Sequence, residues 1–178
     1  MHPLEKFAYC PVCGSKHFTE KDKKSKHCEN CGFEYYLNPS AATAAFIRND
    51  KGELLVVRRK CNPGKGTLDL PGGFADLEET LEECIRREVE EETSLIVDHT
   101  EYLFSLPNKY RYSEFDSPTL DAFFACNVSG ETNAEAKDDA AELMWLPLDE
   151  IHTEQFGLRS VRHALFNYLE KERENLKK

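Results

Sequence analysis

An acidic segment, Leu70 to Leu95, holds the side chains of this sequence that are best suited to binding a cation. It reads LPGGFADLEETLEECIRREVEEETSL and contains nine Asp and Glu residues. Most acidic helices are solvated surfaces, so the positions of the carboxylates around the helix matter more than their number. On a helix over residues 77–93, the apolar stripe holds Leu81, Cys84, Ile85 and Val89, and the opposite face holds Glu79, Glu83, Arg86 and Glu90.

Three glutamates of this segment do not follow the polar face. Glu88 and Glu92 fall within the apolar stripe, and Glu91 lies at its edge. Carboxylates that face a core are desolvated at a cost unless they are paired or bind a metal. A divalent cation that prefers oxygen ligands removes this conflict, so the segment predicts a site for Mg2+ or Mn2+.

The residues around these glutamates have supporting roles. Gly72 and Gly73 permit a close backbone approach just before the helix, and we expect the carbonyl of Gly72 to join the metal shell. Arg87 follows Glu83 by four residues and Glu79 by eight, so ion pairing would lock the start of the helix to the metal-binding face.

Two pairs of cysteines predict a second metal site. Cys10 and Cys13, and then Cys28 and Cys31, form two C-x-x-C units, and each unit is followed by a glycine that permits a tight turn. Two such turns bring four thiolates to one ion at about 2.3 Å, the geometry of a tetrahedral zinc site. A site closed by four thiolates has no open position, so we expect a structural Zn2+ worth on the order of 10 kcal/mol of folding free energy.

The elements that must position these residues follow from the rest of the pattern. An Asn-Pro turn in YYLNPS (35–40) separates the lysine-rich, cysteine-rich start from a longer body with alternating apolar residues. In the body, the sequence predicts two strands joined by a hairpin turn, one helix, three strands and a final helix. The expected ranges are 41–49, 53–60, 77–93, 101–106, 119–129, 141–147 and from about 155 onward. This order favours an α/β fold with a mixed sheet between helices.

Composition limits the compartment and the partners. The 178 residues have a formal net charge of −10, which argues against broad coating of nucleic acid. No stretch approaches the roughly 20 apolar residues that span a bilayer, so we expect a cytoplasmic protein without a membrane partner. The seven cysteines do not suggest a disulfide framework, which also favours a reducing compartment.

From Gly73 to Leu95 the acidic segment resembles the Nudix box, GX5EX7REUXEEXGU. Each position matches except one, where Ser94 replaces the final glycine at the helix stop. The resemblance implies an α/β/α Nudix sandwich over residues 39–178, preceded by a zinc ribbon at 1–38. It also implies hydrolysis of a nucleoside diphosphate linked to another group. By position, Glu88 and Glu92 would be the main Mg2+ ligands, and Glu91 would assist the metal or activate water.

A zinc ribbon directly before the box is similar to the NADH pyrophosphatase group, whose N-terminal domain this chain does not contain. The resemblance implies that Tyr36, five residues after the last ribbon cysteine, contacts substrate. The group's SQPWPFPxS signature corresponds to SLPNKYRYS (105–113), which keeps Tyr110 and Ser113 and suggests a base-stacking loop around Tyr110 and Tyr112. Arg58 and Arg59 end a strand beside a Gly-rich loop, where they either bind the outer phosphate or are solvated charges.

The group's third metal-binding carboxylate lies six residues before a tryptophan. Counting back from Trp145 gives Asp139, with Glu142 as the alternative and a plain polar turn as the remaining interpretation. The expected reaction is attack of water on one phosphorus of a dinucleotide or ADP-ribose type substrate, with Glu91 or Asp139 accepting the proton, to give two monophosphates.

Two other functions stay open at this stage. The ribbon and its lysine run KDKKSK (21–26) could deliver an NAD-capped RNA end to the site, or the domain could sense nucleotides without turnover. The expected partner is a small nucleotide, and the ribbon and the final helix are the surfaces expected in a homodimer.

Overall fold

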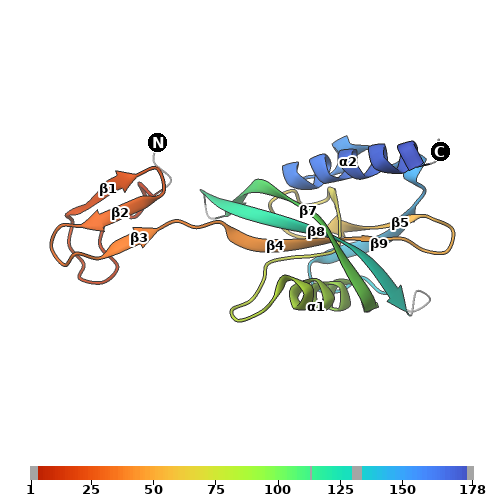
Figure 1. The fold of residues 1–178 in the computed structure, drawn as a ribbon, viewed down its shortest axis with the longest axis horizontal. Coiled ribbons are helices and arrows are strands. Elements are labelled where there is room, and N and C mark those ends of the chain that lie inside the picture. Colours follow the sequence, from red (N-terminus) through yellow and green to blue (C-terminus); the bar gives the residue numbers. More distant parts are fainter. Residues whose placement is uncertain (1–3, 113, 130–133, 176–178) are drawn as a thin grey trace.

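The computed structural model describes residues 4–112, 114–129 and 134–175 of the chain. A small three-stranded unit at the N-terminus is joined to a larger body of strands and two helices (Figure 1). No helix among the described residues is long and apolar enough to cross a membrane. The elements are β1 (Phe18–Asp22), β2 (Ser25–Cys28), β3 (Glu34–Tyr36), β4 (Ser40–Ile47), β5 (Leu54–Arg59), β6 (Leu68–Asp69), α1 (Leu81–Thr93), β7 (Ile96–Tyr112), β8 (Phe115–Ser129), β9 (Ala140–Leu146) and α2 (Arg159–Asn175), with 3-10 turns at Leu148–Glu150 and Thr153–Gln155.

The N-terminal unit is an antiparallel sheet in the order β1-β2-β3. Its apolar core is small: Phe18, Cys10 and Cys28 are buried and pack against Phe33 and Tyr35. So little apolar area supports the expectation that a metal stabilises this unit. The division of the chain at residue 38 lies between β3 and β4, and independent folding of the two parts stays a prediction.

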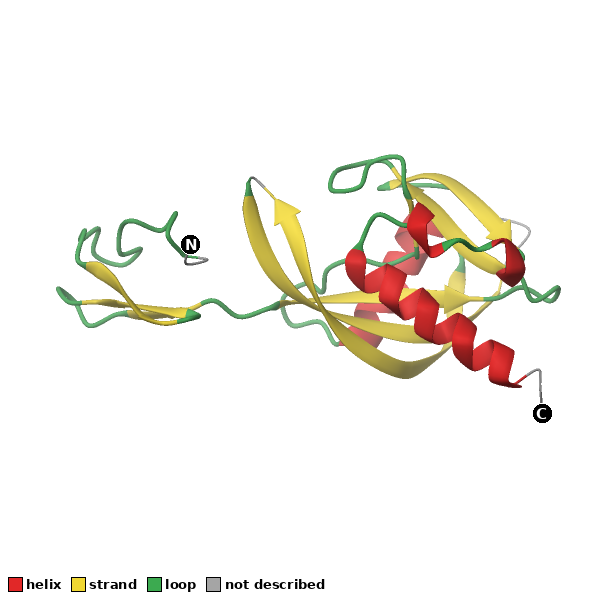
Figure 2. Ribbon diagram, turned by 90° about the horizontal axis from the view of Figure 1, so that it is seen from above, coloured by secondary structure: helices red, strands yellow, loops and turns green. Residues whose placement is uncertain are grey.

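The body contains two three-stranded sheets, β4-β8-β7 and β6-β5-β9. β4 pairs with β8 in parallel and β7 pairs with β8 antiparallel, so the first sheet is mixed. The helices α1 and α2 lie on opposite sides of the strands (Figure 1). Figure 2 shows α2 crossing over the long strands β7 and β8. The expected α/β/α sandwich is therefore confirmed.

Alternation along the buried strand β4 produces the two cores of the sandwich. Ala44 and Phe46 belong to the core under α2, whereas Ala45 and Ile47 belong to the core under α1. Successive side chains of a strand point to opposite faces, so a strand covered by helices on both sides needs an uninterrupted apolar run. AAFI at the end of β4 is such a run.

The first helix of the body begins four residues later than the pattern predicted. Thr80 is its N-cap: its hydroxyl accepts from the Glu83 N–H, and the Glu83 carboxylate accepts from the Thr80 N–H. Leu77, which the prediction placed in the helix, is 97% exposed, and Glu78 has a positive φ of 64°. The capping box T-x-x-E was present in the sequence and defines the true start.

The strands also differ from the expected ranges. The turn at residues 49–52 is present, but β4 and β5 enter different sheets and share only one bridge, Arg48 to Leu54. β7 and β8 form a hairpin far longer than predicted, in which Pro107 pairs with Leu120 and Pro118 with Lys109. Because prolines usually mark loops, these two prolines concealed the full length of the strands. The final helix starts at residue 159, and the sequence had placed its start at about 155.

Candidate active site

One cavity of about 360 Å3 gathers the acidic face of α1, the glycine loop before it, and residues of β5, β7 and β8. Its size is within the range of small-molecule sites. The predicted residues Gly72, Glu88, Glu91, Glu92, Tyr110 and Asp139 all line it, together with Arg59, Asp69, Phe74, Asn108 and Asp121, among others.

The three glutamates of α1 differ in how deeply they lie in this cavity. Glu92 is 6% exposed and accepts a hydrogen bond from the Gly72 N–H at 2.9 Å. Glu88 is partly buried, and Glu91 is exposed at the entrance. Glu90 does not line the cavity, so the helical phase that set the three glutamates apart from Glu90 agrees with their placement.

Two glycines let the backbone come close to these carboxylates. A Cβ on Gly72 would lie 2.2 Å from the carbonyl oxygen of Thr43, and Gly72 has a φ of 144°, which favours glycine. A Cβ on Gly73 would lie 2.5 Å from the Glu88 carboxyl carbon. The Glu88 carboxylate thus occupies the space that a side chain at residue 73 would fill.

Arg87 holds the acidic face together. Its Nε and Nη2 donate to the two carboxylate oxygens of Glu79 at 2.8 and 2.9 Å. Its Nη1 donates to Glu88 at 2.8 Å and to Glu91 at 3.0 Å, and its Nη2 also donates to the carbonyl of Phe74. The predicted pairing with Glu79 is confirmed, and the same guanidinium positions two of the cavity glutamates.

The electrostatics of this face fit a bound cation. Burial raises the pKa of Glu92 to about 8; the Gly72 N–H opposes this shift, and the charges of Glu88 and Asp69 add to it. Burial also raises the pKa of Glu88, against the effect of Arg87. Desolvated carboxylates that repel one another are a donor set of hard oxygens, the chemistry that Mg2+ and Mn2+ prefer.

The segment before β9 brings further carboxylates to the cavity. Asp138 and Asp139 both line it, in a turn in which Asp138 has a φ of 46°. The turn is held against α1, since the Lys137 N–H donates to the carbonyl of Glu92 at 2.9 Å. Glu142, the alternative third ligand, does not line the cavity and accepts from Arg58 Nε at 2.9 Å.

Of the two strand-end arginines, Arg59 lines the cavity and the predicted Arg58 does not. Arg58 is bonded to Glu142 and to the carbonyl of Gly66. Arg59 donates to the buried Asp69 at 2.5 Å and to the Tyr110 hydroxyl at 3.3 Å. Adjacent residues of a strand face opposite ways, so the sequence could not say which of the two would enter the cavity.

The aromatic residues predicted to bind substrate are separated by the fold. Tyr110 lines the cavity and meets the Phe74 ring edge to face, with centroids 5.2 Å apart. Tyr112 is 70% exposed and lies on a strand, so the predicted stacking loop around both residues is wrong. Tyr36 is in the ribbon, where its hydroxyl donates to Glu34, and its substrate contact stays a prediction. Ser113 lies outside the described residues.

Several cavity residues were missed by the sequence analysis. Phe74 follows the glycine pair directly, and Asp69 and Asp121 are carboxylates in otherwise apolar strands. A charged residue within a buried strand is the signal that would have identified the last two, because such residues are rarely buried without a partner or a function.

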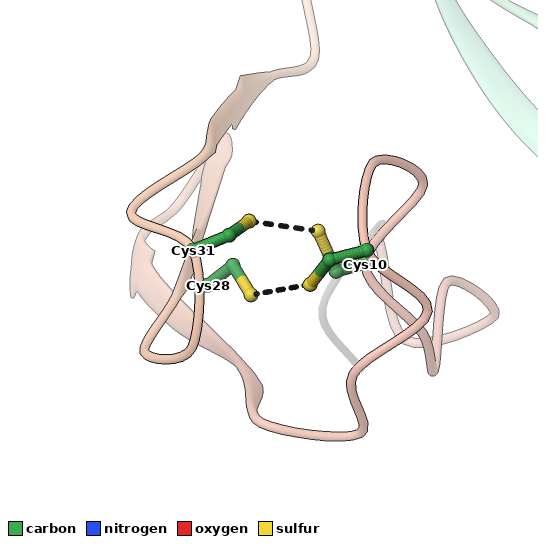
Figure 3. A group of neighbouring side chains, drawn as sticks. Cys10, Cys28 and Cys31 are labelled. Carbon is green, nitrogen blue, oxygen red and sulfur yellow. Dashed lines mark hydrogen bonds between the residues drawn. The ribbon is translucent and has the colours of Figure 1, made fainter.

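The four ribbon cysteines form the predicted cluster. Their sulfur atoms all lie within 4.8 Å of one another, with 3.7 Å between Cys10 and Cys31 and 3.6 Å between Cys13 and Cys28 (Figure 3). Zinc–sulfur bonds of about 2.3 Å in a tetrahedron place the sulfurs about 3.8 Å apart, which agrees with this spacing. The Ser15 N–H and the Asn30 amide lower the pKa of Cys13 to about 6, whereas, against a hydrogen bond from the Phe33 N–H, burial and the other three thiols raise the pKa of Cys31 to about 12.

The two glycines after the cysteine pairs permit the turns that close this cluster. Gly14 and Gly32 have φ values of 71° and 76°, and each donates its N–H to the backbone carbonyl of the first cysteine of the preceding pair. The residues therefore fit a closed Zn2+ site.

Comparison with known proteins gives one family. The model of the NUDIX domain matches residues 38–165. Over 150 residues the chain is 30% identical to the NAD-capped RNA hydrolase NudC of Photobacterium profundum, covering 84% of this chain and 53% of that protein. It is 33% identical over 138 residues to the ADP-ribose pyrophosphatase of Methanocaldococcus jannaschii, covering 76% of this chain and 77% of the relative.

A solved structure has the same architecture over nearly the whole chain. The NUDIX hydrolase of Nitrosomonas europaea superposes with a TM-score of 0.71 at 19% identity, covering 93% of this chain and 92% of that one. The chain spans about half the length of the NudC protein that it matches.

Proposed function

This chain belongs to the NUDIX family, and we propose that it hydrolyses the diphosphate bond of a nucleoside diphosphate linked to another moiety. The substrate is of the ADP-ribose or NADH type, and the products are two monophosphates. The observation that carries this proposal is the acidic face of α1, where Glu88, Glu91 and Glu92 line one cavity beside the two glycines Gly72 and Gly73.

Glu88, Glu92 and Asp139 are the side chains that would hold Mg2+ or Mn2+, with the Gly72 carbonyl as a further oxygen ligand. When bound, the ion neutralises charge on the diphosphate and favours attack by water. Glu91 is exposed at the entrance and retains one carboxylate oxygen outside its bond to Arg87, so it serves as the proton acceptor. Arg87 has a positioning role, because its bonds to Glu79 fix where Glu88 and Glu91 lie.

The nucleoside end of the substrate fits the other residues of the cavity. Phe74 and Tyr110 offer aromatic surface to a base, and Arg59 presents a guanidinium beside it. The name of the archaeal relative, ADP-ribose pyrophosphatase, supports an adenosine diphosphate as the substrate.

The test is an activity panel of ADP-ribose, NADH and diadenosine polyphosphates, run with and without Mg2+ or Mn2+. We expect cleavage only with metal, and loss of at least about 100-fold in kcat for Glu92→Gln. Glu90→Gln is the matched control, since Glu90 is on the same helix but exposed away from the cavity. Equal rates for Glu92→Gln and the native protein would show that the metal site is misassigned. Binding without turnover across the panel would instead favour a nucleotide sensor.

A second candidate is removal of an NAD cap from RNA, and one surface favours it. A groove of about 740 Å3 between the ribbon and the β7–β8 hairpin is lined by Lys6, Lys23, Lys24, Lys109 and Arg111, and also by Glu5, Glu114 and Asp116, the last of which pairs with Arg111. The rest of the lysine run contributes less than the sequence suggested. Lys26 is buried and donates to the carbonyl of Phe7.

Competition between free NADH and an NAD-capped oligonucleotide decides between these two substrates. RNA is the favoured substrate if native protein prefers the capped oligonucleotide, the double variant Lys23→Glu/Lys24→Glu loses that preference, and the remote exposed control Lys51→Glu keeps it. Cytoplasmic location and a homodimer stay predictions, which fractionation and size-exclusion chromatography with light scattering would test.

A further inference from the structure

The cavity extends from the glutamates of α1 to a buried carboxylate on β8. Burial raises the pKa of Glu92, and the charge of Asp69 raises it further. Burial also raises the pKa of Asp69, and the charge of Asp121 raises it further. All three carboxylates line the cavity. Glu92 belongs to the proposed metal-binding face, and Arg59 neutralises Asp69, so Asp121 is the one of these three that has no assigned role.

Asp121 is held entirely by neutral groups. Its Oδ1 accepts from the Thr119 hydroxyl at 2.5 Å, and its Oδ2 accepts from the Asn108 amide at 3.1 Å and from the Ser160 hydroxyl at 2.5 Å. The side chain is 7% exposed, and no salt bridge reaches it in the part of the chain that the structure describes. The two arginines that line this cavity are bonded to other carboxylates, Arg59 to Asp69 and Arg87 to the glutamates of α1.

A buried carboxylate without a counter-charge is costly unless hydrogen bonds fill its oxygens. An ionised carboxylate has about four acceptor positions, and the three donors above leave one position open, on Oδ1. Asp121 lines the cavity, so its carboxylate belongs to the wall that a bound molecule contacts.

We propose that Asp121 determines the substrate specificity of this cavity by accepting a hydrogen bond from an N–H or O–H group on the nucleoside part of the substrate. The inference rests on the proposed function, because that function places a nucleoside in this cavity.

The surroundings of Asp121 suit a flat ring that carries a donor. Phe74 and Tyr110 line the same cavity with their rings edge to face, and Phe123, Leu158 and Val161 add apolar surface. A purine or pyridine ring buries its faces on such surface, and its exocyclic amino or amide group, or the attached ribose hydroxyls, would reach the carboxylate.

A purely structural role makes a different prediction. Asp121 joins three elements, because its partners are Asn108 on β7, Thr119 on β8 and Ser160 on α2. If tying these elements together were its whole role, its loss would lower stability and leave the choice among nucleotides unchanged.

The experiment measures binding of AMP, IMP and 2′-deoxy-AMP to the zinc-loaded full chain by calorimetry. IMP replaces the amino group of adenine with a carbonyl, and 2′-deoxy-AMP lacks one ribose hydroxyl. We expect native protein to bind AMP at least about tenfold more tightly than one of the two analogues, a difference of about 1.4 kcal/mol. Which analogue binds weakly tells whether the base or the ribose supplies the donor.

Asp121→Asn should lose that discrimination and should raise KM for ADP-ribose about tenfold, with kcat within about threefold of native. Ser160→Ala is the matched control: it removes one hydrogen bond to Asp121 but keeps the carboxylate, so it should lower Tm and preserve discrimination. Equal affinities of native protein for the three nucleotides would overturn the proposal whether or not the variants fold, and so would discrimination that persists in Asp121→Asn.

The two proposals fail in different ways. Discrimination among the monophosphates without cleavage of any diphosphate would remove the proposed hydrolysis and leave the role of Asp121. Cleavage of ADP-ribose without discrimination among the monophosphates would remove the role of Asp121 and leave the proposed hydrolysis.

Discussion

Ser94 ends α1 in a conformation that serine adopts at a cost. Its φ is 61° and its ψ is 12°, in the left-handed region, and its N–H donates to the carbonyl of Glu90 as a helix C-cap. Its side-chain Oγ is buried and has no hydrogen-bond partner among the described residues. Glycine occupies this position in the box that the segment resembles, so we predict that Ser94→Gly stabilises the protein.

The magnitude follows from three contributions. Removing the left-handed penalty of a residue with a Cβ gains about 1 kcal/mol, and removing a buried hydroxyl without a partner gains about 1 kcal/mol or more. The greater freedom of glycine in the unfolded chain costs about 0.5–1 kcal/mol. The expected net gain is about 1–2 kcal/mol, or a rise in Tm of roughly 3–6 °C for a domain of this size.

The assay is urea unfolding at fixed zinc, followed by fluorescence of Trp145. This is the single tryptophan of the chain, and it packs against the core under α1, so it reports on the body and not on the ribbon. Ser94→Ala is the control, because it removes the hydroxyl but keeps the left-handed strain. We expect Ser94→Ala to gain less than Ser94→Gly, and ADP-ribose hydrolysis to stay unchanged in both, since Ser94 does not line the cavity.

Two results would refute this reasoning. Stabilisation by glycine that falls about 0.5–1 kcal/mol short of that by alanine would show that backbone strain contributes nothing, and destabilisation by glycine would show that the serine makes a favourable contact at the helix end.

Three further predictions follow from the site and the ribbon. Gly73→Ala places a Cβ against Glu88, so Mg2+ affinity measured by calorimetry should fall about 10–100-fold with little change in Tm; unchanged affinity would mean that Glu88 is not a ligand. Because the pKa of Glu92 is raised from 4.5 to about 8, the free energy of unfolding of the metal-free native protein should fall as pH rises through that range. Urea unfolding at each pH should show a smaller fall for Glu92→Gln. Equal pH dependence of the unfolding free energy in the two proteins would contradict this prediction. Chelation should release about one zinc per chain and make residues 4–38 susceptible to protease while Trp145 fluorescence is unchanged; a ribbon that stays resistant would show that zinc is not its stabiliser.

The local arrangement of the two metal sites was predictable from the sequence alone. A helix turns 100 degrees per residue, so the spacing of Glu88 and Glu92 determines that they share a face whatever surrounds them. The two cysteine turns are equally local, because each depends on a C-x-x-C unit and the glycine after it. These features are set by interactions between residues close in the chain.

The remainder of the cavity was decided by pairing between distant strands. Arg59 rather than Arg58 faces the cavity because of the register in which β5 meets β9. A shift of one residue would reverse every side chain of such a strand. Asp121 accepts from Ser160 only because α2, 38 or more residues later, comes back to β8. The sequence by itself therefore determined which residues are proposed to bind the ions, and the tertiary structure decided which residues line the rest of the cavity, since helix phase is local and strand register is not.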